Sequence, residues 1–328
     1  MEIQDTKILE VRNLSIDYYT LEGVIHAVRN IKLSIEKGES VCLVGESGSG
    51  KSTVGLAIAL ALPQNALPKG EILYKGRNIL EFKENEKKNY LGKEVSIIFQ
   101  DPAASLNPLF TIGDQMRDII THHLHLDKEK AYEYAKDMLK KVGLPDPNRV
   151  LRSYPHELSG GMLQRVNIAI ALSTAPKILI ADEPTTMLDV TLQAQILDLL
   201  QSLKNELNLS MLFITHNLGV AAEICDRIAV MYAGVLLEAG KIDEVLLNPL
   251  HPYTQKLIKC VPTVSIKKHK LSYIPGSLPD PRFLPPGCPF AERCRNPLPQ
   301  CKERMPSMIK KGETHEVACF RYEGNRNE

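Results

Sequence analysis

Runs in which apolar and polar residues alternate open the chain and predict β-strands, because successive side chains of a strand point to opposite faces. The run at residues 40–44 follows a turn at Lys37–Gly38–Glu39. Residues 80–93 are charged, and there we expect an exposed turn or a short helix. The predicted strands of this part are residues 8–11, 14–18, 31–35, 40–44, 70–74 and 95–99.

The middle of the chain changes to a helical period. Apolar residues recur at helical spacing between residues 112 and 142, and Gly143 ends that segment. A further helix is predicted after Gly161. The helix expected over residues 191–206 separates two apolar runs, and this alternation implies parallel strands joined by crossover helices. The two runs are residues 178–182 and 211–215, and a terminal hairpin is predicted over residues 226–240.

The composition changes again beyond about residue 250. Prolines cluster there and both periodicities are lost, so this part is expected to be held by something other than a large apolar core. We predict an α/β chain with two domains, residues 1–250 and an extension over residues 251–328. A helical subdomain is expected at about residues 101–170. The clustered prolines are at positions 275, 279, 281, 285, 286, 289, 297 and 299.

Chain length, net charge and the lengths of the apolar stretches indicate which classes of protein to expect. The 328 residues exceed one typical core, so we expect two or three substructures. The formal net charge is +1, so no strongly basic face is forced and nucleic acid is not an expected partner. The first residues lack a signal pattern, and the longest apolar stretch, residues 54–62, is far shorter than a bilayer span. We expect a soluble, cytoplasmic protein whose membrane role, if any, comes through a partner.

The glycine-rich stretch between the apolar run 40–44 and the predicted helix after it follows the pattern G-x-x-x-x-G-K-[S/T] of a phosphate-binding P-loop. Its glycines permit backbone angles that turn successive N–H groups toward a phosphate, and the helix adds its positive end. Lys51 supplies a mobile cation, and the Ser52 hydroxyl can ligate Mg²⁺. The candidate phosphate-binding residues are Gly45, Ser47, Gly48, Ser49, Gly50, Lys51, Ser52 and Thr53.

Two carboxylates end the predicted strand at residues 178–182. In a P-loop protein this pattern is the Walker B element, in which Asp182 holds Mg²⁺ through water. Glu183 is then placed to orient or deprotonate the attacking water. Together with the P-loop, the pair predicts an enzyme that hydrolyses a nucleoside triphosphate.

Leu158–Arg165, with the sequence LSGGMLQR, resembles the signature of ATP-binding cassette (ABC) ATPases. It lies between the P-loop and Walker B, as that family requires. The other family motifs occur in the order that the family requires. Each of them alone is weak evidence, and its position relative to the others is what supports the assignment. They are Gln100 as the Q-loop, Leu188–Asp189 as the D-loop, His216 as the switch histidine, and Tyr18, with Tyr19 less favoured, as the aromatic that stacks on adenine.

The resemblance covers residues 8 to about 262 and implies a RecA-like P-loop fold with an antiparallel β subdomain. In this family two cassettes meet head to tail, with each ATP between one P-loop and the partner's signature. Ser159, Gly160 and Gly161 would then bind the γ-phosphate of the partner's ATP. The implied catalytic residues are Glu183, His216 and Gln100, and the implied Mg²⁺ ligands are Ser52 and Gln100. Two positions depart from the commonest pattern, Met162 in the signature and Met187 in the D-loop.

Three segments narrow the branch to importers of dipeptides and oligopeptides. Residues 100–108, 154–162 and 248–254 resemble the extended Q-loop, the signature region and the start of the C-terminal extension of those proteins. Nickel importers share much of this pattern. The resemblance implies a peripheral subunit on the cytoplasmic face of the membrane, paired with an identical or related cassette. It would be docked on two permease subunits that are fed by an external peptide-binding protein.

Two alternative functions, from other classes of protein, remain to be considered. A soluble ABC ATPase of DNA repair or translation usually carries a coiled-coil insertion or two cassettes in one chain, and neither is present here. A regulatory module that holds ATP without hydrolysing it is disfavoured by Lys51, Asp182, Glu183 and His216.

Four of the seven cysteines, Cys288, Cys294, Cys301 and Cys319, fall within 32 residues. A disulfide framework is disfavoured in a reducing compartment, and a zinc site usually contains closer C-x₂₋₄-C pairs. Unmetallated thiols stay possible. Residues 287–294 resemble the cluster-binding extension of dipeptide importer ATPases, so a structural [4Fe–4S] cluster is favoured. Cys42, Cys225 and Cys260 are scattered, and His315 is expected to be solvated.

Overall fold

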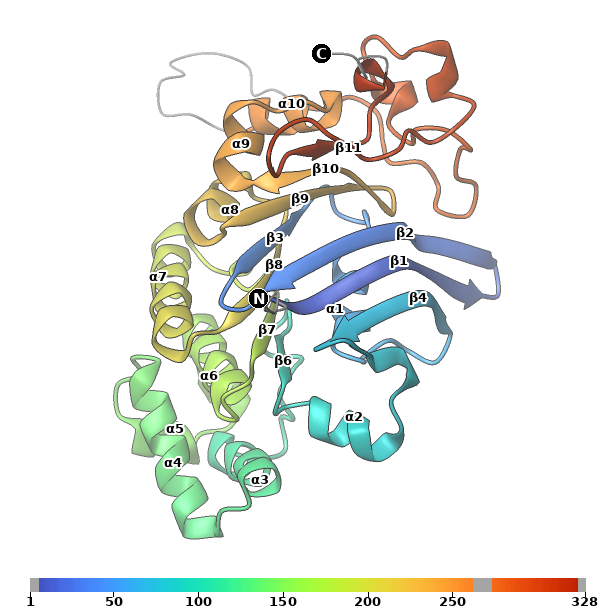
Figure 1. Ribbon diagram of the computed structural model, residues 1–328. Helices are drawn as coiled ribbons and strands as arrows, with labels where there is room; N and C mark the ends of the chain where they lie inside the picture. The colour runs from blue at the N-terminus through green and yellow to red at the C-terminus, as the bar shows by residue number, and fades with distance from the viewer. Residues whose placement is uncertain (1–5, 262–272, 324–328) are drawn as a thin grey trace, which may run out of the picture. The chain divides into compact units, whose positions relative to one another are not determined.

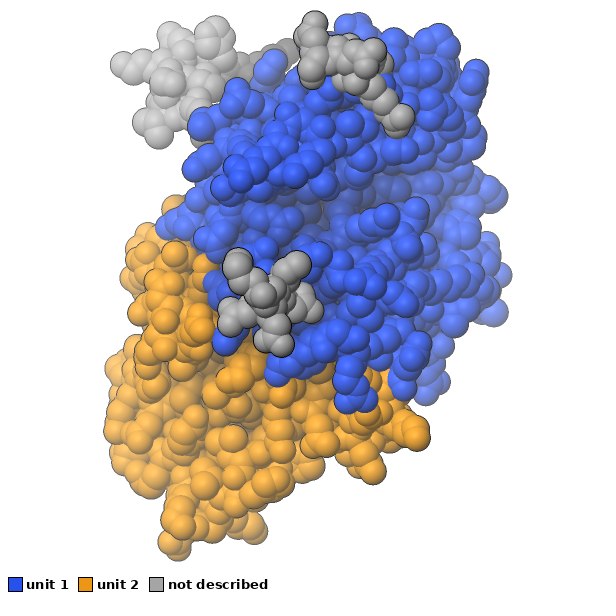
Figure 2. Space-filling model, in the orientation of Figure 1, with its two compact units in different colours: residues 1–81, 213–328 blue, residues 82–212 orange. Residues whose placement is uncertain are grey.

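The computed structural model describes residues 6–261 and 273–323. Its chain divides into two compact units, coloured blue and orange in Figure 2. The first unit combines residues 1–81 with 213–328, and the second comprises residues 82–212. Strand β8 (Ser210–Thr215) begins in the second unit and ends in the first. Sequence segments that are far apart therefore fold together in the first unit.

An antiparallel sheet of four strands opens the first unit, in the order β2-β1-β4-β5. Figure 1 shows β2, β1 and β4 side by side. The predicted short strands at residues 8–11 and 14–18 are one strand, because an irregularity between Val11 and Leu14 keeps the alternation of buried side chains in phase. The antiparallel β subdomain is thus confirmed. Its strands are β1 (Lys7–Thr20), β2 (Gly23–Glu36), β4 (Ala66–Tyr74) and β5 (Arg77–Asn78), with a 3₁₀ turn, η1, over Ile79–Glu81.

A second sheet in the first unit carries the P-loop strand. Strand β3 (Ser40–Val44), buried throughout, pairs in parallel with β9 (Arg227–Tyr232). The predicted hairpin is confirmed, since β9 turns at Ala233–Gly234 into the antiparallel β10 (Val235–Lys241). The short strands β12 (Glu316–Val317) and β11 (Ile309–Lys310) continue the sheet beyond β10. The helices of this unit are α1 (Lys51–Ile58), α8 (Leu218–Ile224), α9 (Ile242–Leu247) and α10 (Pro252–Lys259).

A disulfide joins Cys42, on β3, to Cys225, which follows α8. The two residues are 183 positions apart, and the sequence alone left them as scattered cysteines. Both are buried, so the bond links the P-loop strand to the end of α8 within the core of the unit.

The extension beyond residue 250 packs on β9 through aromatic rings. Tyr253 on α10 and Phe290 are both fully buried, and their ring centroids lie 4.8 and 5.3 Å from that of Tyr232. Burial of such rings contributes on the order of 2–3 kcal/mol each. A compact aromatic cluster therefore anchors the extension. Its described part also contains β11, β12 and the 3₁₀ turns η3 (Ala291–Arg293), η4 (Pro299–Cys301) and η5 (Phe320–Tyr322).

His315 is buried, and the prediction that it is solvated is wrong. Its Nε2 lies 2.7 Å from Oε1 of Glu238, a residue of β10 with no exposed surface. The same carboxylate accepts hydrogen bonds from the backbone N–H groups of Leu250 and His251. A carboxylate removed from water requires such donors, and they tie β10 to the start of the extension.

The second unit contains two parallel strands, β6 (Val95–Ile98) and β7 (Ile178–Asp182), as the alternation of strands and helices predicted. The helical segment at 112–142 is two helices, because His125 adopts a left-handed conformation and Asp127 caps a new helix. The helices are α2 (Glu84–Tyr90), α3 (Ile112–Leu124), α4 (Lys128–Lys141), α5 (Pro147–Arg152), α6 (Gly160–Leu172) and α7 (Val190–Leu207), with a 3₁₀ turn, η2, at Pro155–Glu157.

Helices α3, α4 and α5 contact one another, and α4 also contacts α6 (Figure 1). Their buried side chains recur at helical spacing, for example Ala131, Ala135, Met138 and Leu139 on α4. Among the residues that the structure describes, no helix is long and apolar enough to cross a membrane.

Candidate nucleotide-binding site

The P-loop glycines of the first unit are required by both conformation and space. Gly45 has a φ of +157° and Gly50 a φ of +98°. A Cβ atom at Gly45 would lie 2.0 Å from the carbonyl oxygen of Met231, and one at Gly50 would lie 2.3 Å from that of Ala27. Any larger residue would force the loop away from β9 and β2. The loop shape thus depends on these two glycines.

Lys51 opens helix α1, and its side chain turns back into the P-loop. Its Nζ donates to the carbonyl oxygens of Gly45 and Glu46, at 2.9 Å each, and only 4% of the residue is exposed. Helix α1 begins directly after the left-handed Gly50. A buried cation beside a helix N-terminus is an arrangement that suits a phosphate.

Tyr18 reaches the end of the P-loop from strand β1. Its hydroxyl donates to Oγ1 of Thr53 at 3.2 Å, and its ring is partly buried. Tyr19 is 50% exposed. The contact keeps Tyr18 as the better adenine-stacking candidate of the pair. His216 is exposed and follows β8 in the same unit.

In the second unit, Gln100 and Glu183 lie together. Gln100 Nε2 donates to Oε2 of Glu183 at 3.3 Å, and the hydroxyl of Thr186 donates to the same oxygen at 2.9 Å. Glu183 is 8% exposed and has a φ of +45°, an uncommon conformation for this residue type. Such local strain is typical of functional positions. Asp182, the residue before Glu183 and the last of β7, is also buried.

Thr186 was not among the predicted site residues. A hydroxyl two residues before the D-loop Leu188 gives no distinctive signal in the sequence, whereas its hydrogen bond to Glu183 is plain in the structure.

The signature residues lie at the N-terminus of α6. Ser159 caps this thirteen-residue helix by accepting a hydrogen bond from the N–H of Met162 at 3.4 Å. Ser159 and Gly160 are exposed, and a Cβ at Gly160 would meet nothing within 4 Å. Gly161 is buried, and a Cβ there would lie 3.2 Å from Leu192, so this glycine also serves packing against α7. The helix end thus presents Ser159 and Gly160 to solvent. Met187 of the D-loop is 65% exposed.

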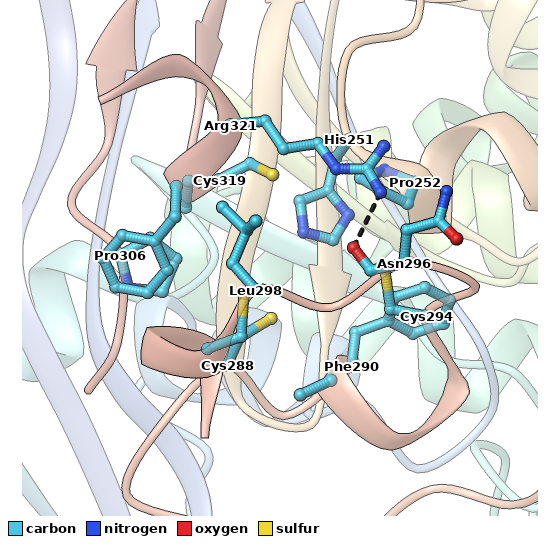
Figure 3. Close-up of a pocket in the computed structure, with 14 residues that line it drawn as sticks. His251, Pro252, Cys288, Phe290, Cys294, Asn296, Leu298, Pro306, Cys319 and Arg321 are labelled. Atoms are coloured by element: carbon cyan, nitrogen blue, oxygen red, sulfur yellow. Dashed lines mark hydrogen bonds between the residues drawn. The ribbon is translucent and has the colours of Figure 1, made fainter. Parts of the chain in front are cut away.

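The four clustered cysteines of the extension line one small cavity, as Figure 3 shows for Cys288, Cys294 and Cys319. The cavity volume is about 20 Å³, roughly room for one water molecule. All four thiols are free, and Cys288 N–H donates to the carbonyl of Cys301 at 2.8 Å. Within residues 6–261 and 273–323, no three His, Cys, Asp or Glu side chains have the geometry to hold a single metal ion.

Burial raises the pKa of two of these thiols, those of Cys288 and Cys319. Burial raises the pKa of Cys288 to about 12, and the neighbouring cysteines add to the shift. Burial also raises the pKa of the Cys319 thiol. His251, which lines the same cavity, has its pKa lowered by burial to about 3 and is neutral. The cavity thus favours uncharged groups.

The structure gathers the predicted ATP-site residues in two groups. The first unit holds the P-loop residues with Tyr18, and the second holds Gln100, Asp182 and Glu183, with the signature at the start of α6.

Comparison with known proteins gives two family matches. Residues 28–186 match the family described as "ABC transporter", and residues 237–301 match "Oligopeptide/dipeptide transporter, C-terminal region". The chain is 45% identical to the oligopeptide transport ATP-binding protein AppD of Bacillus subtilis, over 96% of this chain and 97% of that one. It is 42% identical to the dipeptide transport ATP-binding protein DppD of the same organism, over 96% and 94% of the two chains.

The chain belongs to the ATP-binding subunits of oligopeptide and dipeptide ABC transporters.

Solved structures of ABC cassettes confirm the predicted fold. The dimeric post-hydrolysis structure of the cassette MJ0796 bound to ADP and Pi matches 71% of this chain and 98% of its own, at 29% identity and a TM-score of 0.64. An ABC ATPase of this family binds ATP with Mg²⁺, hydrolyses the nucleotide to drive transport, and works as one component of a transporter complex. The predicted enzyme class is therefore confirmed.

Proposed function

We propose that this ABC ATPase energises the import of dipeptides or oligopeptides. The similarity to AppD and DppD along nearly the whole chain carries this proposal, because it includes the extension as well as the cassette. The match of residues 237–301 to the oligopeptide/dipeptide C-terminal region supports it further. The proposed domains are the cassette over residues 1–250, with its helical subdomain at about 101–170, and the extension over 251–328.

In this proposal the P-loop residues, Gly45 and Ser47–Thr53, hold the ATP phosphates and Tyr18 stacks on adenine. Lys51 gives the phosphates a cation within a loop of backbone N–H groups. Ser52 and Gln100 would ligate Mg²⁺, Asp182 would hold the ion through water, and the bound ion would neutralise charge that develops on the phosphates. Ser159, Gly160 and Gly161 bind the γ-phosphate of the partner's ATP.

Glu183 is the proposed catalytic carboxylate. Its Oε2 already accepts hydrogen bonds from Gln100 and Thr186, so the carboxylate is held in one orientation. A carboxylate so fixed can orient and accept a proton from an attacking water. His216 is the third proposed catalytic group, placed in an exposed loop after β8.

The proposed partners are a second cassette, identical or related, and two permease subunits. These place the chain on the cytoplasmic face of the membrane as a peripheral subunit, with an external peptide-binding protein delivering the substrate. The dimeric cassettes among the structural relatives support the pairing.

Transport by the reconstituted complex tests this function. In vesicles that contain the permeases and the external binding protein, we expect ATP-dependent uptake of labelled peptides and none of ⁶³Ni²⁺. The Lys51→Ala variant should lower uptake by about 100-fold or more, because the phosphates lose their cation. Exclusive uptake of Ni²⁺, or of neither solute, would reject the peptide assignment.

We further propose that Cys288, Cys294, Cys301 and Cys319 hold a [4Fe–4S] cluster, with zinc as the alternative metal. The chemical type of the donors suits such a group, since four thiols line one apolar cavity, but among the described residues no three of them have the geometry to hold a metal ion. A bound cluster would crosslink loops that have little core of their own. Binding would require the four loops to separate, because the cavity is only about 20 Å³.

Iron content tests the cluster directly. Protein purified without oxygen should be brown and contain about four iron atoms per chain. Cys294→Ser should remove most of the iron and the visible absorbance. Cys260→Ser is the matched control, because Cys260 is also a free thiol of the extension but does not line the cavity. A colourless anaerobic protein carrying zinc would refute the cluster.

A further inference from the structure

The C-terminal extension contacts the ATP-binding loop itself, through Glu46. Glu46 is the second residue of the P-loop pattern, where the pattern allows any amino acid. Arg293 Nη1 donates to both carboxylate oxygens of Glu46, at 2.9 and 3.1 Å. The two residues are 247 positions apart in the sequence. Both belong to the first unit.

All three nitrogens of the Arg293 guanidinium form hydrogen bonds. Its side chain is only 7% exposed, and Nη1 also donates to the hydroxyl of Tyr232 at 3.0 Å. Nε and Nη2 donate to the carbonyl oxygens of Pro275 and Ile274. An exposed ion pair contributes little to stability, but a buried guanidinium with five hydrogen bonds holds one geometry. The backbone carbonyl of Arg293 accepts from Lys256 Nζ on α10.

The extension holds the backbone of Glu46 as well as its side chain. The N–H of Glu46 donates to the hydroxyl of Tyr253, on α10, at 2.9 Å. The carbonyl of Glu46 accepts from Lys51 Nζ at the same distance. The peptide groups of Glu46 therefore connect the extension, on one side, to the phosphate-binding lysine on the other. Leu278 lies over the same loop, 3.9 Å from where a Cβ of Gly48 would be.

We propose that Arg293 is a positioning residue for ATP binding: by holding Glu46, it keeps the P-loop and Lys51 in the conformation that receives the phosphates. Its contact with the loop is made through Glu46. This role rests on the proposed ATP site at residues 45–53. Through this role, the extension would form part of the nucleotide-binding site. The proposal does not depend on a metal in the cysteine cavity.

The test measures Mg·ATP binding by calorimetry on the full chain in a Glu183→Gln background, in which hydrolysis is expected to be slow. Arg293→Ala should raise the Kd for Mg·ATP by about tenfold, and Arg293→Lys by less, because the charge remains while the fork of donors is lost. Glu46→Gln, which keeps the side-chain size, should raise the Kd several-fold. The double variant should bind no more weakly than Arg293→Ala, because both changes break one interaction.

In the hydrolytically active chain, the KM for ATP should rise by the same factors while kcat at saturating ATP stays within twofold. A merely structural role would lower the melting temperature without this split between KM and kcat. The matched control is Arg282→Ala, which removes an exposed arginine of the same extension that pairs with Asp280 and Glu22 and not with the P-loop. Its Kd should be unchanged.

Iron content is measured on every variant, because Arg293 precedes Cys294. An unchanged Kd in both Arg293→Ala and Glu46→Gln, additive effects in the double variant, or an equal effect of Arg282→Ala would overturn the positioning role. Failure of the ATP site itself is distinguishable, since Lys51→Ala would then still bind Mg·ATP.

Discussion

Replacing Glu183 with glutamine is expected to slow ATP hydrolysis by about 10²–10⁴-fold, the usual contribution of a general base, while Mg·ATP still binds. The amide keeps the size of the side chain and can still contact Gln100 and Thr186, but it cannot accept a proton from water. Phosphate release by the purified chain, measured together with nucleotide binding, separates the two effects.

Glu206→Gln is a suitable control for that experiment. Glu206 is also a carboxylate of the second unit, but it forms an exposed ion pair with Lys141 at 3.0 Å. Its hydrolysis rate should match that of the wild type. Equal rates for Glu183→Gln and the wild type would remove Glu183 from the mechanism.

Gly160→Glu should lower ATP hydrolysis by about 100-fold, comparable to the loss of a transition-state donor, without preventing the chain from binding its own nucleotide. The new carboxylate would stand at the helix end that is proposed to receive the partner's γ-phosphate, and like charges repel. A Cβ at Gly160 meets nothing within 4 Å, so the fold should tolerate the change.

Gly160→Ala provides the comparison, because it adds a methyl group without charge and should retain most of the activity. Hydrolysis and binding of ATP are measured for both variants. If Gly160→Glu hydrolyses ATP normally, the signature does not act on a partner's nucleotide.

Local patterns predicted much of this protein. The P-loop, the Walker B strand and the signature helix each depend on neighbouring residues, so the sequence places them correctly, and the hairpin at Ala233–Gly234 follows from its turn. The division of residues 112–142 into two helices was missed, because apolar positions continue at helical spacing through His125 and only its left-handed backbone breaks the chain of hydrogen bonds.

Contacts between distant segments were harder to predict. The disulfide of Cys42 with Cys225, the burial of His315 against Glu238, and the hold of Arg293 on Glu46 all join residues that are far apart in sequence. Nothing local marks them, since a charged or histidine side chain in a loop is usually solvated. The contacts of His315 and Arg293 become visible only when the extension is packed on β9 and β10, and the disulfide only when α8 is packed near β3.

Sedimentation of the Glu183→Gln chain, alone and mixed with the second cassette of its transporter, tests most directly whether ATP joins two cassettes. In one of the two samples Mg·ATP should convert single cassettes into pairs of twice the mass, and adding Gly160→Glu should abolish the change. An unchanged mass with saturating Mg·ATP in both samples would contradict a mechanism in which this chain forms half of a nucleotide-closed pair.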